Sequence, residues 1–505
     1  MPAGKRFIIV FVVDGLRPDA ITAEDTPTLH RLRAEGVDFA NSHAVFPTVT
    51  RVNAAALATG TQPGTNGIVG NQIYVPAVDA QRALDTGNVR NLIRVDEATA
   101  GQLVLAPTLA ERLQAHGLRL VAVSSGSTGS AFLLNPRAPA GVGALVNGYL
   151  DPGRTVGYPS EVSAAVLAKF GPAPPKAGAD RYDEPVAWTQ RVLREYVLPE
   201  LAPDVVLNWL TEPDHSQHTR GVGSPTARAA LRHDDAEIAR VLATMDALGL
   251  TDGADVLVAS DHGFTTNSAG VDVARELVDA GLKASADSAD VVLASSGQAV
   301  ALHVEGRARE RIAAIARFVQ SREWGGVVFT EGRAPGEPHG MVEGTFSLEL
   351  IHLVHYGRAH SERGPDLVLT FPWTSRPNAF GVPGSDLANV SGGAAPYFSD
   401  HGSMSPWNIR NAGLAWGADF KKRVTVRTPT GNVDVAPTIL SLLGIEDLGG
   451  LDGRVLAEAI EGGPDGEQMV VETRVHTVEA GSYAAAVQVT TVGGHRYVDK
   501  SWRIV

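Results

Sequence analysis

The clearest strand signal in the chain is Phe7-Ile8-Ile9-Val10-Phe11-Val12-Val13-Asp14-Gly15, an apolar run that ends in an Asp-Gly pair. Its largely β-branched residues are typical of a central parallel strand that is covered on both faces. The run is far too short to cross a bilayer and has no cleavage region, so it predicts a buried strand and not a signal peptide. An Asp-Gly pair after a strand is most often a simple turn, so Asp14 gains meaning only from other residues.

Strand and helix signals alternate along the chain around this run. Apolar strands are predicted at 118–123, 204–210 and 255–260, and helices at 26–36, 107–117 and 227–248. This alternation predicts an α/β fold with a large, mostly parallel central sheet flanked by helices. Residues 265–398 have a different rhythm and predict a smaller α+β cap insertion, with some core strands near its end. The core then comprises residues 1–264 and 399–505.

Composition excludes several classes of protein. The 505 residues are 44% apolar and 20% charged, as in soluble globular proteins. A net charge of −13 argues against a nucleic-acid or anionic-membrane partner, although bound metal ions can still attract an anionic substrate. Without cysteine, any zinc must be held by histidines and carboxylates. As the sequence stands we expect a cytoplasmic protein, and an exported chain without its signal would look the same.

Acidic and imidazole side chains follow several predicted strands. Asp14, Asp214 and the pair Asp261-His262 each come after an apolar run. Ligands of open α/β sheets collect at the carboxyl ends of the strands, so these side chains should share one edge. Asp214 and His218 are four residues apart and can reach one ion from a single helical turn. Asp261 and His262 could serve one ion or two, and a capped helix start with a surface histidine is the plain alternative for Asp214 and His218.

A polar loop, Phe46-Pro47-Thr48-Val49-Thr50, runs into small residues that predict a helix ending at Gly60. The Thr50 hydroxyl would lie beside the free N–H groups of the helix start, where negative charge is favoured. Taken alone, Thr50 would be a capping threonine. A second loop, Ser124–Ser130, resembles a phosphate cradle but has no lysine after its glycines and lacks the Walker spacing. A strand-to-loop turn is its better interpretation.

Taken together and in their order along the chain, Asp14, the Thr50 loop, Asp214 with His218, and Asp261-His262 resemble the motifs of the alkaline phosphatase superfamily. The resemblance is closest to its nucleotide pyrophosphatase/phosphodiesterase branch. The resemblance also includes the late helix 432–445 and the Asp-His-Gly at 400–402. It implies an alkaline-phosphatase-like core and two metal sites. One site would be held by Asp214, His218 and His401. The other would be held by Asp14, Asp261 and His262, with Thr50 as its reactive neighbour.

The resemblance also implies a mechanism for a small phosphorylated substrate. Thr50 would attack phosphorus to give a phosphothreonine, which water then releases. Two divalent ions would assist, with zinc favoured and manganese or a mixed pair as alternatives. Asn71 would stabilise the equatorial oxygens, and Tyr74 stands where the family also has a tyrosine. A monomer or a homodimer is expected.

Arg51 departs from the pattern, because this branch commonly has an aromatic residue after the nucleophile. An arginine could grip an additional phosphate oxygen, which would favour monoesters or phosphonates, or it could turn into solvent. His215 and Gln217 replace the usual residues inside the metal turn but keep its spacing.

Hydrolysis of phosphodiesters is the function expected first. A phosphomonoesterase or phosphonate hydrolase with the same site is the alternative. A sulfatase is disfavoured because there is no cysteine to convert. A non-catalytic relative that binds metal or ligand is the alternative from another class, and the intact Thr50 argues against it.

Overall fold

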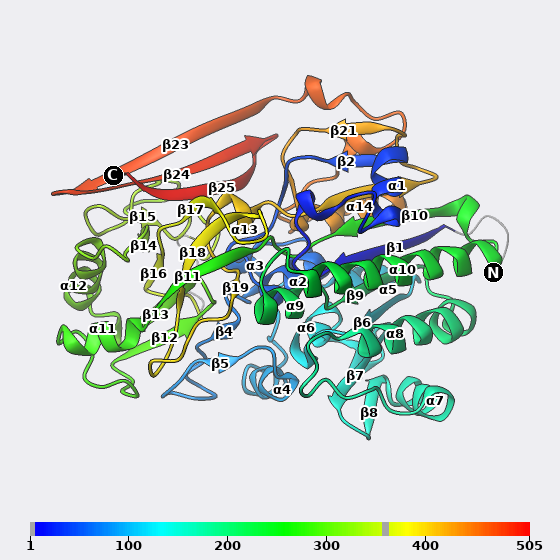
Figure 1. Cartoon of the computed structure of the whole chain (residues 1–505), viewed down its shortest axis with the longest axis horizontal. Helices are drawn as coiled ribbons and strands as arrows, with labels where there is room; N and C mark the ends of the chain where they lie inside the picture. The colour runs from blue at the N-terminus through cyan, green and yellow to red at the C-terminus, as the bar shows by residue number, and fades with distance from the viewer. Residues whose placement is uncertain (1–5, 356–362, 505) are drawn as a thin grey trace.

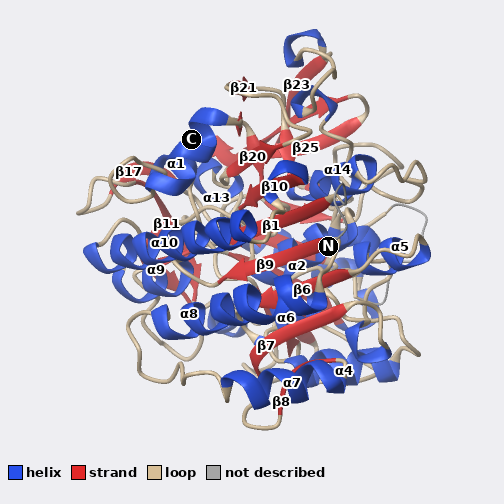
Figure 2. Cartoon of the chain, turned by 90° about the vertical axis from the view of Figure 1, so that its right-hand side faces the viewer, coloured by secondary structure: helices blue, strands red, loops and turns tan. Residues whose placement is uncertain are grey.

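The computed structural model describes residues 6–355 and 363–504, so residues 1–5, 356–362 and 505 of the predicted core and insertion lie outside it (Figure 1). A nine-stranded sheet in the order β21-β2-β20-β10-β1-β9-β6-β7-β8 forms its centre, and Figure 2 shows most of these strands as successive rungs. The strands are β1 (Phe7–Val13), β2 (Val37–Phe39), β6 (Leu120–Ser124), β7 (Ala144–Asp151), β8 (Thr155–Tyr158), β9 (Val205–Leu210), β10 (Ala254–Ala259), β20 (Gly413–Gly417) and β21 (Val424–Val426).

Strand β1 lies in the middle of this sheet, parallel to both β9 and β10. All its residues are buried, as predicted. Phe7, Ile9 and Phe11 face the helices α1 (Pro27–Glu35), α8 (Asp183–Val192) and α10 (Pro225–Ala247). The alternate side chains face α2 (Thr50–Thr59), α6 (Thr128–Leu134) and α14 (Val435–Leu442). Because the side chains of a strand alternate between faces, only a continuously apolar strand can serve both layers. The α/β architecture expected from the sequence is confirmed.

Two smaller sheets come mainly from residues 265–398, beside the central sheet (Figure 1). One has the order β12-β13-β16-β14-β15 and packs against α11 (Val273–Asp279) and α12 (Arg309–Gln320) around a separate apolar cluster. Its strands are β12 (Val291–Ser295), β13 (Ala299–Val304), β14 (Val328–Thr330), β15 (Phe346–Ser347) and β16 (Leu367–Thr370). The other has the order β17-β18-β11-β19, and its strands are β11 (Thr265–Val271), β17 (Thr374–Pro377), β18 (Pro383–Asn389) and β19 (Ser399–Asp400).

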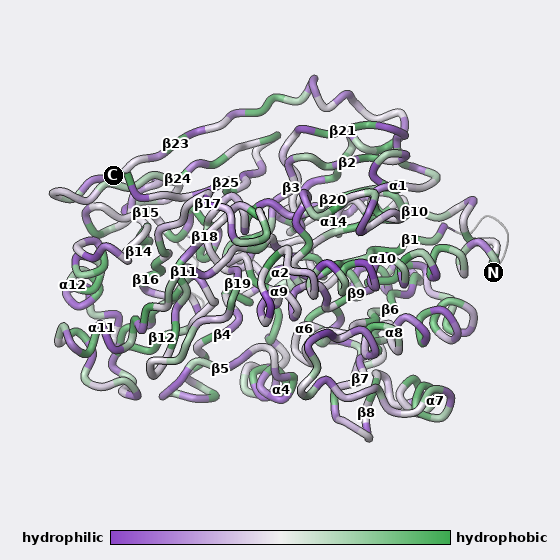
Figure 3. The backbone as a smooth tube through the Cα atoms, in the orientation of Figure 1, coloured by the Kyte–Doolittle hydropathy of each residue, from purple (hydrophilic) through white to green (hydrophobic). Residues whose placement is uncertain are grey.

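The C-terminal part is rich in strands. Strands β23 (Val471–Ala480), β24 (Tyr483–Val492) and β25 (His495–Ile504) form an antiparallel sheet. In Figure 3 the outer strand β23 carries hydrophilic residues among hydrophobic ones, which fits its exposed position. No helix in the described ranges is long and apolar enough to cross a membrane.

Some helices of the structure differ from those that the sequence predicts. Residues 76–104 carry few periodic signals, yet they contain a helix, α4 (Val89–Ala98), which Asn88 caps by accepting the Arg90 N–H. The amphipathic pattern of residues 186–198 predicts a single helix there, but α8 ends at Val192 and the chain continues as a π-helix, Leu193–Leu201. That segment contains Pro199, which cannot donate a backbone hydrogen bond.

Candidate active site

Three neighbouring parallel strands, β9, β1 and β10, end at the same edge of the central sheet. Asp14 follows β1, and Asp214 begins the helix α9 (Asp214–Arg220) after β9. Asp261 and His262 follow β10. His401 comes from a different sheet, directly after β19, which pairs with β11. The shared edge expected from the strand ends is therefore present, and β19 adds the last histidine.

The six side chains form two groups of three. Within each group the possible ligand atoms lie within 4.8 Å of one another. The inner group is Asp14, Asp261 and His262, and the outer group is Asp214, His218 and His401. The rings of His262 and His401 stack with centroids 3.6 Å apart, so the groups are adjacent. Of the two arrangements left open for Asp261 and His262, the geometry has both in one group.

Each histidine is held in one tautomer by a backbone carbonyl. The Nδ1 atoms of His218, His262 and His401 lie 3.0, 3.0 and 2.9 Å from carbonyl oxygens of Ser399, Gly263 and Thr48, respectively. A carbonyl can only accept a hydrogen bond, so each Nδ1 carries the proton. Each Nε2 then presents its lone pair toward its group, which is the arrangement that metal-binding histidines adopt.

The carboxylates of the inner group are also held on one side. Trp209 Nε1 donates to Asp14 Oδ2 at 3.0 Å, and the Gly15 N–H donates to Asp261 Oδ1 at 2.9 Å. The opposite oxygens, Asp14 Oδ1 and Asp261 Oδ2, are buried without a hydrogen-bond donor among the described residues. Burial and the charges of Asp261 and Asp214 raise the pKa of Asp14 well above its usual range.

This arrangement fits a bound cation. Asp261 Oδ2 lies 2.9 Å from His262 Nε2, and two acceptors this close need a proton or a cation between them. Asp214 Oδ1 in the outer group is likewise buried without a donor in the described part of the chain. It lies 3.4 Å from the Nε2 atoms of His218 and of His401. Imidazole and carboxylate donors are a set that zinc and manganese accept.

Thr50 begins α2 but does not cap it. The cap position is Val49, and no side chain there bonds to the helix. The buried Thr50 hydroxyl instead lies 3.4 Å from His262 Nε2. The alternative of a capping threonine is therefore wrong. Thr48 fastens this loop to the segment after His401, because its hydroxyl donates to Ser403 O and accepts the Gly402 N–H.

The predicted substrate-binding residues have different surroundings. Asn71 Oδ1 accepts the Arg51 N–H at 3.2 Å, which turns its amide next to the start of α2. The Arg51 side chain is 20% exposed and does not simply point into solvent. Its Nε is buried without a hydrogen-bond partner among the described residues. Tyr74 donates its hydroxyl to Ala80 O and packs on His303, so its assignment to substrate stays a prediction.

The two unusual residues inside the metal turn have structural partners. The ring of His215 stacks on Tyr182 with centroids 3.7 Å apart. Gln217 Nε2 donates to Gly15 O at 3.0 Å, which ties α9 to the residue after Asp14. Neither side chain belongs to the two groups, so the spacing of Asp214 and His218 survives these replacements.

Sequence reasoning missed two residues beside the inner group. Trp209 is the last inward-facing ring of β9 and supplies the donor to Asp14, but an apolar strand offers no signal for a polar role. Lys176 lies in a proline-rich loop without periodicity, and its ammonium donates to the carbonyl oxygens of Ser125 and Gly126. Those carbonyls belong to the loop 124–130, which lacks a lysine of its own.

Comparison with known proteins identifies the family of this chain. The family model for type I phosphodiesterase / nucleotide pyrophosphatase matches residues 8–371. The chain belongs to this family. Every predicted site residue of this phosphodiesterase-family chain except His401 falls inside the matched range. The family comprises hydrolases of phosphate esters within the alkaline phosphatase superfamily, as the sequence resemblance indicated.

Some individual proteins are also similar to this chain in sequence or in fold. Venom phosphodiesterase of Naja atra is 33% identical over 86 residues, 17% of this chain and 10% of the relative. Venom phosphodiesterase 2 of Crotalus adamanteus is 33% identical over 94 residues, 18% and 12% of the two chains. The matched stretches thus span about a tenth of these relatives. Among solved structures, an inactive variant of murine ectonucleotide pyrophosphatase/phosphodiesterase 5 in complex with AMP has a TM-score of 0.58 and 18% identity, covering 88% of this chain and 96% of that one. That likeness shows the fold.

Proposed function

We propose that this chain is a metal-dependent hydrolase of phosphodiesters or pyrophosphates that acts through Thr50. The observation that carries the proposal is the position of the Thr50 hydroxyl. Thr50 starts a helix without capping it, and its hydroxyl lies 3.4 Å from His262 Nε2. His262 belongs to one of two adjacent groups of side chains that can bind metal ions. A threonine with only a structural role has no need of such neighbours.

Two divalent cations are part of the proposal. Asp14, Asp261 and His262 would hold one, and Asp214, His218 and His401 the other. Three protein donors at each site leave a coordination position open, as in catalytic zinc sites. When bound, the cations would lower the pKa of the Thr50 hydroxyl and neutralise charge on the phosphate. Zinc is favoured by the imidazole and carboxylate donors, and manganese or a mixed pair would suit them as well.

The protein groups have distinct tasks in this reaction. The Thr50 oxygen attacks phosphorus, the bond to the leaving oxygen breaks, and the phosphate remains on Thr50 until water releases it. The backbone N–H groups at the start of α2 and the amide of Asn71 stabilise the equatorial oxygens. Asn71 is suited to this task because its Oδ1 is committed to the Arg51 N–H, which leaves Nδ2 as the donor.

We also propose that residues 265–398 form a cap over the core of 1–264 and 399–505 and influence the choice of substrate. The ring of Tyr397 packs on that of His218 with centroids 5.0 Å apart, and the Phe398 N–H donates to His218 O. The side chains of both residues are largely exposed, at 61% and 65%. The end of this segment therefore borders the outer group from the solvent side.

A direct test compares 4-nitrophenyl diester, monoester and sulfate substrates on protein loaded with zinc or manganese. The proposal expects turnover of the diester to exceed that of the other two. Preference for the monoester would favour the phosphomonoesterase alternative. No turnover of any substrate by metal-loaded protein would overturn the proposal in favour of a binding protein. Trapping of a phosphorylated peptide that contains Thr50, by rapid acid quench and mass spectrometry, tests the covalent step.

A further inference from the structure

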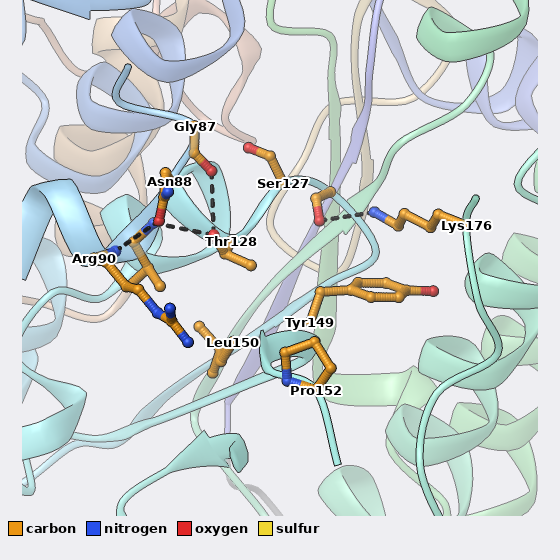
Figure 4. Close-up of a pocket in the computed structure, with 11 residues that line it drawn as sticks. Gly87, Asn88, Arg90, Ser127, Thr128, Tyr149, Leu150, Pro152 and Lys176 are labelled. Atoms are coloured by element: carbon orange, nitrogen blue, oxygen red, sulfur yellow. Dashed lines mark hydrogen bonds between the residues drawn. The ribbon is translucent and has the colours of Figure 1, made fainter. Parts of the chain in front are cut away.

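A cavity of about 420 Å³ is lined by residues that include Gly87, Gly126 and Lys176 (Figure 4). Two glycines of its lining connect it to the candidate active site. A Cβ on Gly87 would come within 2.3 Å of Arg51 Nη2, so the Arg51 guanidinium lies directly against this wall. Gly126 lies against the ring of Trp209, which donates to Asp14. Arg51 and Trp209 therefore pack against the wall of the cavity at Gly87 and Gly126, although neither side chain lines it.

Lys176 is the charged group most closely enclosed by this cavity. Its Nζ donates to the carbonyl oxygens of Ser125 and Gly126, which leaves one of its three N–H bonds for another acceptor. No carboxylate of the described residues lies within ion-pair distance of it. Figure 4 shows its side chain extending along one side of the cavity, with Arg90 and Asn88 on the other. Asp14 and Glu212 act on this ammonium by their charge without forming an ion pair with it, so its remaining N–H is available to an anion.

The aromatic rings beside Lys176 are already engaged. The Lys176 ammonium lies 4.1 Å from the ring centroid of Tyr149 and 5.1 Å from that of Tyr182. Tyr182 also stacks on His215. The Tyr149 hydroxyl donates to Pro174 O, which fixes its ring in place. Of the described residues that line the cavity, only Tyr149 has an aromatic ring, and the Lys176 ammonium already lies over it, which favours an anion over a nucleobase as the group bound here.

The opposite wall of the cavity carries a second cation, Arg90, but the first backbone N–H groups of α4 already have acceptors. The Val89 N–H donates to the hydroxyl of Thr128, and the Arg90 N–H donates to Asn88. The first two N–H groups of α4 are therefore satisfied by Asn88 and by Thr128 of α6. The Arg90 guanidinium is 76% exposed and lies 3.5 Å from Asp151, so it contributes positive charge at the mouth. Lys176 remains the half-buried cation that an anion could contact.

We propose that this cavity binds a second anionic group of the substrate, a carboxylate or a phosphate on the substituent of the phosphate ester, and that Lys176 recognises it. The proposal rests on the proposed function and deepens it, because it names the class of ester that the site selects. Arg51 has an unpartnered Nε among the described residues, and its Nη2 lies against Gly87 and 3.9 Å from Asp85; it would hold the same substituent nearer to phosphorus. Diesters with a neutral substituent would be poorer substrates.

The kinetic test uses three 4-nitrophenyl diesters on metal-loaded protein, whose second substituents are methyl, 2-carboxyethyl and 2-phosphonoethyl. The wild-type chain should prefer one or both anionic esters over the methyl ester by kcat/KM, and the two anionic arms distinguish carboxylate from phosphate. In Lys176→Gln this preference should fall by about tenfold to a hundredfold, because a charged hydrogen bond is lost. Hydrolysis of the methyl ester should stay within about threefold of wild type.

Matched variants keep this test falsifiable. Lys169→Gln removes the same charge from a surface lysine that pairs with Glu200 and should leave the preference unchanged. Lys176→Arg keeps the charge and should retain much of it. Equal preference in the wild-type chain and Lys176→Gln overturns the proposal. So does a uniform loss on all three esters, because that would mean a purely structural lysine.

A binding measurement separates this proposal from the proposed function. Calorimetry on metal-loaded Thr50→Ala compares 3-phosphonopropionate with ethylphosphonate, which lacks the carboxylate. Tighter binding of 3-phosphonopropionate that disappears in Thr50→Ala/Lys176→Gln supports the anion site even if no ester is hydrolysed. Equal affinity for the two compounds in a chain that hydrolyses the methyl ester overturns the anion site and leaves the proposed function intact.

Discussion

The inner and outer groups use similar ligands but are built in different ways. The inner group comes entirely from the ends of the adjacent strands β1 and β10, and all three side chains are buried. The outer group combines one turn of α9 with a histidine after β19, and Asp214 and His218 are 16% and 18% exposed. The inner group is thus part of the core, whereas the outer group depends on contacts between the central sheet and a smaller one.

The largest effect is expected at the Thr50 hydroxyl, which lies beside His262 of the inner group. Thr50→Ala should lower kcat on the diester by roughly 10⁴-fold or more, because the covalent route is closed. Metal content, measured by plasma mass spectrometry, should stay near that of wild type since all six ligands remain. Thr50→Ser keeps a hydroxyl at the same place and should retain measurable turnover. Activity of Thr50→Ala close to wild type would exclude the covalent mechanism.

The contrast between the groups predicts different consequences of losing one ligand. His401→Ala should empty only the outer site, because His401 touches the inner group by ring stacking and not by a shared ligand atom. Metal content should fall from about two ions to about one per chain, and turnover should fall by about 10² or more. The exposed His116→Ala is the matched control and should change neither.

Asp261→Ala tests the inner group in the same way and should also affect folding. Asp261 Oδ1 accepts the Gly15 N–H in the core of the sheet, so the substitution removes a buried hydrogen-bond acceptor as well as a ligand of the ion. We expect loss of the inner ion together with a lower melting temperature, measured by calorimetry. A melting temperature lowered more by His401→Ala than by Asp261→Ala would contradict the distinction between the groups.

The same distinction explains how far the sequence could predict this molecule. Asp14, Asp261 and Asp214 follow apolar strands, and because parallel strands share an edge, their proximity could be inferred from strand signals alone. His401, which lies in the outer group with Asp214, follows the two-residue strand β19. Only the family resemblance assigned His401 to a metal site. The role of Thr50 as a capping residue was equally compatible with its sequence, because a helix start does not reveal where a hydroxyl turns.

Contacts between distant loops could not be predicted at all. Lys176 donates to carbonyls of the loop 124–130, about fifty residues away along the chain, and no periodicity links the two. Helix α4 was missed for a related reason. Its start is fixed by hydrogen bonds to Asn88 and to the Thr128 hydroxyl of another helix. The periodicity of its own sequence is too weak to predict the helix without these contacts. The contacts of single side chains on irregular loops, such as those of Lys176, can be found only from the three-dimensional structure.

A smaller effect is expected from the residue that holds Asp14 in place. Trp209→Phe keeps an aromatic ring in β9 but removes the N–H that donates to Asp14 Oδ2. Loss of a donor to a metal ligand typically weakens metal affinity by about 10- to 100-fold. Titration with a competing chelator should show this loss at the inner site while the outer site is unchanged. Trp188→Phe is the matched control, because Trp188 Nε1 is buried without a partner among the described residues.

The smallest effect concerns pH and the cavity beside the inner group. Burial lowers the pKa of Lys176 to about 7, although Asp14 and Glu212 partly oppose the shift. The ammonium is therefore charged below about pH 7 and increasingly neutral above it, in contrast to an exposed lysine. The ratio of kcat/KM for the 2-carboxyethyl ester to that for the methyl ester should fall severalfold between about pH 6 and about pH 8.5, because kcat/KM reports groups of the free enzyme. In Lys176→Arg the ratio should be flat, since a guanidinium stays charged throughout this range. A wild-type ratio that is flat or rises with pH would mean that Lys176 does not contact the substituent.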